Sequence, residues 1–120
     1  MRMLAVGPLA WVLACVGPPA PDAALCQDVL SRVCLARSCP GVSEQLGLGS
    51  QECFATLEAR TGCGTEAFVL TEPSRERLLV CRQPLVRRST DPGKAPTCGE
   101  MAEVVRDCPD LTAFLRGSAP

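Results

Sequence analysis

Cysteine is the residue type in this sequence whose number and spacing most directly predict chemistry. The chain of 120 residues contains nine cysteines, and Cys15 stands apart from the others in an apolar segment near the start. An even number of cysteines in a small exported chain is typical of a set of disulfide bonds. We therefore predict that the remaining eight are oxidised in pairs: Cys26, Cys34, Cys39, Cys53, Cys63, Cys81, Cys98 and Cys108.

Zinc binding is the alternative use for a group of cysteines. Structural zinc sites usually contain cysteine pairs separated by two to four residues. Cys34 and Cys39 are the one pair that approaches this spacing. Because the sequence also begins like an exported protein, we expect disulfides, with no metal and no cofactor.

Catalytic residues are hard to find. The sequence contains no histidine, which is the usual general base of secreted hydrolases, and no serine or cysteine has an obvious activating partner. The glutamates are spaced like solvated helix faces and helix caps: Glu44, Glu52, Glu58, Glu66, Glu72 and Glu76. We expect that the protein is not an enzyme.

The first residues have the pattern of a secretory signal peptide. A single positive charge at Arg2 precedes the apolar run 4–16, and small residues follow up to Ala24. This order predicts cleavage between Ala20 and Leu25. A membrane anchor is the competing interpretation, but a run of 13 residues is shorter than the roughly 20 that a bilayer requires.

This interpretation divides the chain into a leader, 1–24, and a single cysteine-rich domain, 25–120. Cys15 would be lost with the leader, or, in a bacterium, would be lipidated after the stretch 12–14. The C-terminal residues lack the apolar tail of a lipid-anchor signal. We therefore expect a secreted, extracellular product without a membrane span.

Charge and aromatic content narrow the class further. The net charge is −1, lysine occurs only at position 94, and no basic stripe with interleaved aromatic residues is present. These features exclude a typical nucleic-acid partner. After loss of Trp11, only three phenylalanines remain, so the core is poor in rings and disulfides are the expected compensation.

Periodicity and capping signals predict a mainly α fold, a small disulfide-stapled bundle of three to four short helices. The apolar positions repeat with helical spacing, and Pro and Gly stand where helices would end. The first expected helix is 26–37, and the second follows Ser50 as N-cap and ends at Gly62. The third runs from Arg75 to about Pro84. The fourth starts at the Thr97–Glu100 capping box and ends near Cys108. The run 67–70 is compatible with a strand or a helical turn, and single helical turns are expected at 43–46 and 111–115.

Helix geometry limits the disulfide pairing. Cys26 and Cys34 on one helix would lie about 12 Å apart, which exceeds the roughly 7 Å limit between the Cα atoms of a disulfide. The bonds should therefore join different helices, with Cys34 to Cys39 left open as a local pair. The same argument separates two further pairs: Cys53 from Cys63, and Cys98 from Cys108.

The segment 87–96 is polar, rich in turn formers and expected to be exposed. It begins with the dibasic pair Arg87-Arg88, a possible processing site whose alternative is a solvated loop end. Further arginines lie on the helix before it, and together they form the densest positive patch of the sequence: Arg75, Arg77, Arg82, Arg87 and Arg88. Such a patch can meet an acidic partner or a sulfated polysaccharide, or it can be an ordinary solvated face.

Two stretches resemble a known family. The stretch 25–34, LCQDVLSRVC, followed by Cys39, and the stretch 53–57, CFATL, resemble the helical cysteine-rich domains of the GDNF family receptor alpha and growth-arrest-specific co-receptors. The interval from Cys39 to Cys53 is longer than in those domains, and Cys81 stands alone where paired cysteines are expected. The resemblance implies binding of a growth factor or its receptor and transfers no ligand-contact residue.

These observations lead to the expectation of a secreted module that acts by binding an extracellular protein, a receptor or a growth factor. They leave open the partner, the oligomeric state and the pathway. One alternative is a peptide-hormone or cytokine-like precursor that is processed at Arg87-Arg88. Another is a small lipid carrier, in which a cavity would be lined by Val29, Leu30, Val33, Phe54, Leu57, Leu78 and Leu79.

Overall fold

The computed structural model describes residues 21–91 and 93–117, and in these residues the fold is helical, with no strand. The mainly α fold predicted from the sequence is therefore confirmed. The chain order of the helices is α2 (Asp22–Leu35), α3 (Val42–Gln45), α4 (Cys53–Thr61), α5 (Arg75–Val86), α6 (Cys98–Asp107) and α7 (Pro109–Arg116).

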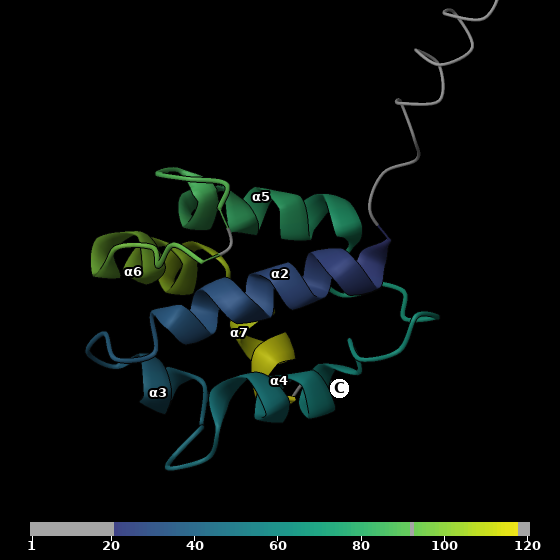
Figure 1. Ribbon diagram of the computed structural model, residues 1–120, viewed down its shortest axis with the longest axis horizontal. Helices are drawn as coiled ribbons and strands as arrows, with labels where there is room; N and C mark the ends of the chain where they lie inside the picture. Colours follow the sequence, from purple (N-terminus) through teal and green to yellow (C-terminus); the bar gives the residue numbers. More distant parts are fainter. Residues whose placement is uncertain (1–20, 92, 118–120) are drawn as a thin grey trace, which may run out of the picture.

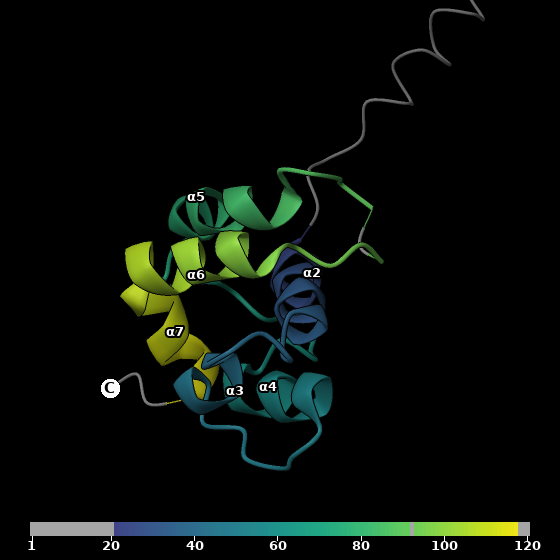
Figure 2. The same ribbon diagram turned by 90° about the vertical axis from the view of Figure 1, so that its left-hand side faces the viewer.

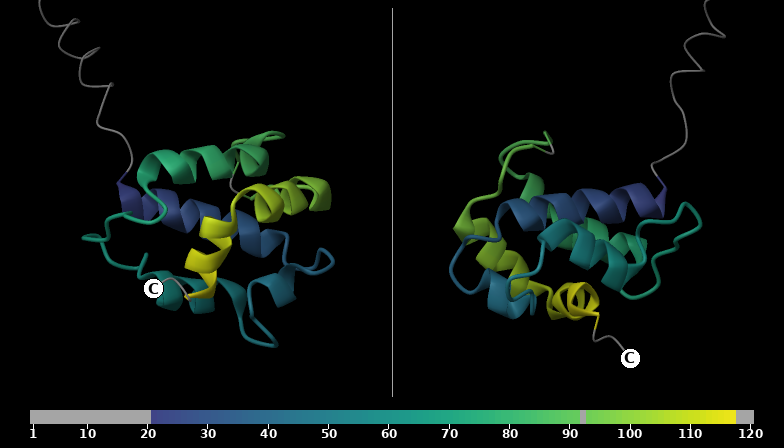
Figure 3. Two further views of the ribbon diagram at one scale, coloured as in Figure 1. Left: turned by 180° about the vertical axis from the view of Figure 1, so that it is seen from behind. Right: turned by 60° about the horizontal axis from the view of Figure 1, so that its bottom comes forward.

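Helix α2 lies at the centre of the arrangement (Figure 1). Helices α5 and α6 run side by side on one side of it, and α3 and α4 lie on the opposite side (Figure 2). Helix α7 bridges these two groups, because it contacts α6 at its start and packs against α4 (Figure 3). Residues far apart in the sequence thus share one core on either side of α2.

Helix α2 begins four residues before the predicted start at Cys26 and ends at Leu35. Its first residue, Asp22, accepts a hydrogen bond from the amide of Leu70 at 2.9 Å. Asp22 also forms an ion pair with Arg75 at 2.6 Å. These two contacts lower the pKa of Asp22. The helix therefore includes residues 22–24, the last part of the predicted leader, while residues 1–20 lie outside the described chain.

Helix α4 has a different N-cap from the predicted one. The cap is Glu52, not Ser50, and its carboxylate accepts hydrogen bonds from the amides of Phe54 and Ala55. These bonds satisfy amides that lack a partner in the first turn and lower the pKa of Glu52. The helix ends as predicted at Gly62, where a φ of 81° favours glycine.

The remaining helices follow their local signals, with two differences. Ser74 caps α5, and the helix continues past Pro84 to Val86. The capping box at Thr97 and Glu100 is present as predicted, with bonds of 2.9 and 3.1 Å. After α6, proline at the first position of α7 starts a helix of eight residues, longer than the predicted turn.

The core is aliphatic and cysteine-rich. All three phenylalanines are only half-buried and pack against its edge. The run 67–70 is irregular, neither strand nor helix; Leu70 is buried while Val69 faces solvent. The most deeply buried aliphatic side chains come from several helices and the loop after α3: Leu30, Val33, Leu46, Leu48, Leu57, Leu78 and Leu111.

Four disulfides connect these elements. They pair Cys26 with Cys63, Cys34 with Cys53, Cys39 with Cys98, and Cys81 with Cys108, with Cα atoms 5.5–6.1 Å apart. Each bond joins different helices or their flanking loops, and the three pairings excluded by helix length do not occur. The local pair Cys34 to Cys39, left open by the sequence, is not formed either.

The disulfide between Cys39 and Cys98 closes the longest stretch of chain, 59 residues. Replacing both cysteines with serine should lower the free energy of unfolding by about 4 kcal/mol, because the unfolded chain regains the entropy of that loop. Urea denaturation monitored by circular dichroism measures this change. A loss smaller than that of the Cys34→Ser/Cys53→Ser variant, whose loop is 19 residues, would contradict the expectation.

Candidate functional site

The described residues bring no catalytic group together. Glu52 caps a helix, and Glu58 accepts a hydrogen bond from Gln27. The other glutamates named from the sequence, Glu44, Glu66, Glu72 and Glu76, are exposed. Their arrangement is that of helix caps and solvated faces.

One group of potential metal ligands is brought together, but its atoms are already bonded. Cys81, Cys108 and Asp110 approach one another within 4.8 Å. The two sulfur atoms form a disulfide, so neither is available as a thiolate. The carboxylate of Asp110 is held by Arg77 at 2.8 Å, and this contact lowers the pKa of Asp110.

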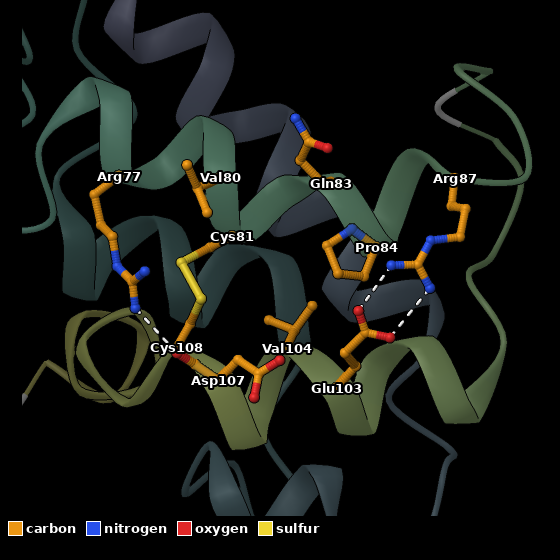
Figure 4. A pocket seen from close by; sticks show the side chains of 10 residues that line it. All are labelled: Arg77, Val80, Cys81, Gln83, Pro84, Arg87, Glu103, Val104, Asp107 and Cys108. Atoms are coloured by element: carbon orange, nitrogen blue, oxygen red, sulfur yellow. Dashed lines mark hydrogen bonds and ion pairs between the residues drawn. A yellow bond between two sulfur atoms is a disulfide. The ribbon is translucent and has the colours of Figure 1, made fainter.

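A groove lies between α5 and α6 (Figure 4). It has a volume of about 270 Å³. The Cys81–Cys108 disulfide, Pro84 and Val104 form its apolar part, and Val80 stands at its α5 side.

One ion pair and one hydrogen bond cross this groove. Arg87 of α5 donates to both carboxylate oxygens of Glu103 on α6, at 3.1 and 2.7 Å (Figure 4). At the opposite end, Arg77 donates to the carbonyl oxygen of Asp107 on α6 and pairs with Asp110 on α7. The positive charges on the α5 side of the groove are therefore paired with carboxylates.

The positive patch suggested by the sequence is neutralised in the structure. Each of its arginines has a carboxylate within ion-pair distance, although the contact of Arg88 with Glu100 is long, at 3.8 Å. The other pairs are Arg75 with Asp22, Arg77 with Asp110, Arg82 with Asp28, and Arg87 with Glu103. A row of ion pairs replaces the expected cationic surface.

The two arginines of the dibasic pair have different surroundings. Arg87 closes the C-terminal end of α5 in a helical conformation and is bound to Glu103. The side chain of Arg88 is 69 % exposed. Leu85, three residues before Arg88, is buried, so an extended protease substrate would require the last turn of α5 to unwind.

The linker after this pair is attached to the core by Arg32. This side chain is only 1 % exposed, and its guanidinium donates to the carbonyl oxygens of Ser89, Thr90 and Asp91. Its Nε is paired with Asp28 at 3.0 Å. A buried cation thus fixes the start of an otherwise largely exposed segment, and no sequence signal distinguished Arg32 from a solvated arginine.

Asp28 is the carboxylate that compensates Arg32, and it also pairs with Arg82 at 2.7 Å. Burial raises the pKa of Asp28, but the hydrogen bonds from the two arginines outweigh it, and the net pKa lies below the usual value. A lowered folded-state pKa stabilises the protein above the unfolded pKa of about 4, and this contribution is lost as the pH falls through the folded pKa.

Asp28→Asn should therefore lower the free energy of unfolding at pH 7 by about 3 kcal/mol, because Arg32 would remain buried without its counter-charge. It should also flatten the decrease in stability between about pH 5 and pH 2. Urea titrations at several pH values measure both effects. Asp107→Asn is the control, since its pair with Arg106 is exposed and its loss should change stability much less than the loss of the Asp28 carboxylate.

Limited trypsin digestion should first cut the folded protein after Lys94, because Lys94 is exposed, lies outside helices and follows the stretch that Arg32 holds. The two resulting pieces remain joined by two disulfides, Cys39–Cys98 and Cys81–Cys108. The unreduced mass should therefore rise by one water, and reduction should release two chains. Release of either piece before reduction would contradict this pairing.

A second groove lies between α3 and α6 and has a volume of about 490 Å³. Its lining is mostly apolar and includes Pro40, Val42, Ala102 and Val105 beside the Cys39–Cys98 disulfide. Neither groove is lined by the residues proposed for a lipid cavity. Of those residues, Leu79 is exposed and Phe54 is half-buried. The other five are buried in the core: Val29, Leu30, Val33, Leu57 and Leu78.

Comparison of the chain with models of protein families, with curated proteins and with solved structures finds no match. In the described residues, no helix has both the length and the apolar character needed to span a bilayer. Inference about function therefore depends on the covalent network and on the surface that it holds in place.

Proposed function

We propose that the protein is a secreted helical module that acts by binding another extracellular protein, of the growth-factor or receptor type. The observation that carries this proposal is the set of four disulfides, which joins helices α2, α4, α5 and α6 and the start of α7 into one covalent network. Disulfides persist in oxidising extracellular compartments. A fixed exterior is suited to recognition.

The α5 face beside the ion-paired groove is the surface that we assign to the partner. Val80 is 57 % exposed and Leu79 40 %, and both are large apolar side chains on an outer helix face. The groove continues this apolar surface down to Val104 and the Cys81–Cys108 disulfide. Burying such side chains against a partner stabilises a complex, and interface centres are enriched in them.

The paired charges at the two ends of the groove limit the chemistry of its occupant. Arg77 and Arg87 border the α5 side, and Glu103 and Asp107 border the α6 side. A complementary protein segment would insert one aliphatic side chain between them. The residues that flank this side chain would be uncharged, because the charges at the groove are already paired.

The two alternative functions lack a specific supporting observation. Processing at Arg87-Arg88 requires the end of α5 to unwind and the Arg87 contact with Glu103 to break. A lipid carrier requires a cavity where five of the seven named side chains instead form a packed core. The binding module requires neither rearrangement.

Binding of the labelled, purified protein to cells tests the proposal. Cells are first treated with heparinase so that proteins are the main remaining ligands, and saturable binding is measured across a panel of cell lines. We expect binding that protease treatment of the cells abolishes and that Val80→Asp weakens at least about tenfold, since a charge cannot enter an apolar interface without cost.

Val69→Asp is the matched control, because Val69 is also exposed, at 66 %, but lies in the loop before α5. It introduces the same charge away from the groove. Absence of saturable binding on every line, or equal losses for the two variants, would argue against the proposed surface.

A further inference from the structure

The arginines of this protein fall into two groups by the atoms that they contact. Those on α5 pair with carboxylates, which cancel their charge. Within residues 21–91 and 93–117, Arg37, Arg60 and Arg116 have no carboxylate within 4.0 Å and donate only to backbone carbonyl oxygens. A carbonyl satisfies the N–H donors but leaves the positive charge in place.

Arg60 and Arg116 hold the same short piece of chain from two helices. From α4, Arg60 donates to the carbonyls of Leu46 and Gly47 at 2.6 and 2.8 Å. From α7, Arg116 donates to the carbonyl of Gln45 at 2.7 Å. The two guanidinium groups therefore share one loop at the end of α3.

The glycines at this point show how closely the two side chains approach the backbone. A Cβ on Gly47 would lie 3.5 Å from the guanidinium carbon of Arg116, and Gly47 has a φ of 60° that favours glycine. A Cβ on Gly117 would lie 3.3 Å from the stem of Arg60. The stem of Arg60 and the guanidinium of Arg116 are thus packed against the chain.

Arg37 extends this group along the same loop. It donates to the carbonyl oxygens of Gly49 and Gln51, so the three arginines hold successive parts of 44–51. Two carboxylates are near in sequence. Glu52 is directed to the first amides of α4, where Arg37 contributes to lowering its pKa, and Glu44 is exposed.

We propose that Arg37, Arg60 and Arg116 form a binding site for a sulfated polysaccharide. Guanidinium groups form paired hydrogen bonds with tetrahedral oxyanions, and the Nε and Nη2 of Arg116 make no hydrogen bond within the described chain. Sulfates repeated along a polysaccharide can contact several such cations at once. The half-buried phenylalanines provide no stacking platform of the kind that single-stranded nucleic acids use.

This site lies apart from the groove assigned to a protein partner and does not depend on it. The groove is formed by α5 and α6, whereas the arginine site is formed by the loop 44–51 with side chains from α4 and α7 and from the end of α2. A matrix or cell-surface polysaccharide would concentrate the protein without occupying the groove.

Titration with a purified heparin dodecasaccharide in low salt tests the proposal. We expect measurable binding that weakens as salt is added and that Arg116→Gln weakens roughly tenfold, since a charge-assisted hydrogen bond is lost. The Arg60→Gln/Arg116→Gln variant should bind more weakly still.

Arg106→Gln is the matched control. It removes the same net charge from an arginine that is paired with Asp107, and the affinity of this variant should stay within about twofold of the parent. Circular dichroism and the unreduced mass verify that each variant is folded and oxidised.

Several outcomes would overturn the site. They are no binding by the parent protein, equal losses for Arg106→Gln and Arg116→Gln, or equal affinity for fully desulfated heparin or for polyglutamate of similar length. Binding to heparinase-treated cells addresses the protein partner separately. Absence of binding to heparinase-treated cells would leave the heparin result unaffected. Absence of heparin binding would likewise leave the result on cells unaffected.

Discussion

Short helices need an external constraint, and here the constraint is covalent. Helices α3, α4, α6 and α7 have 4 to 10 residues, fewer than the 12–15 or so that an isolated helix needs to be even marginally stable in water. The core that they share is aliphatic, and among the described residues it has no fully buried aromatic ring. Four disulfides reduce the entropy of the unfolded chain and hold every helix in reach of α2. The grooves and the arginine site exist only because this network fixes the helix ends.

Arginine provides the second, polar layer of this framework. Connecting segments that are too short or too irregular to bond among themselves expose carbonyl oxygens, and buried or half-buried carbonyls need donors. Arg32 supplies them to 89–91, and Arg60 and Arg116 supply them to 44–47. The planar guanidinium suits this role because one group can donate to several carbonyls. The arginine-rich composition is therefore used inside the fold, not only on its surface.

The sequence predicted what local signals determine. Helical periodicity, the capping box at Thr97 and the glycine at position 62 gave correct helices, and helix length alone excluded three disulfide pairings. Two features were not predicted. Ser50 and Glu52 are both near the start of α4, and Glu52 is the residue that caps it. Asp22 contacts Leu70 and Arg75, which are distant in the sequence. The same limit explains the charged surface. Five nearby arginines look like a cationic patch in the sequence, because the carboxylates that neutralise them come from α2, α6 and α7.

The distribution of charge follows from how each arginine is satisfied. Where a partner helix offers a carboxylate, as α6 offers Glu103 to Arg87, the pair closes a groove and leaves an apolar surface between neutral ends. Where the neighbour is an irregular loop, as at 44–51, only carbonyls are available and the charge persists at the surface. Neutral ion-paired surfaces favour selective contact with a shaped protein partner, whereas uncompensated cations attract polyanions of many shapes. One disulfide-stapled fold thus presents two chemically different faces, and each can be altered by substitution without removing the other.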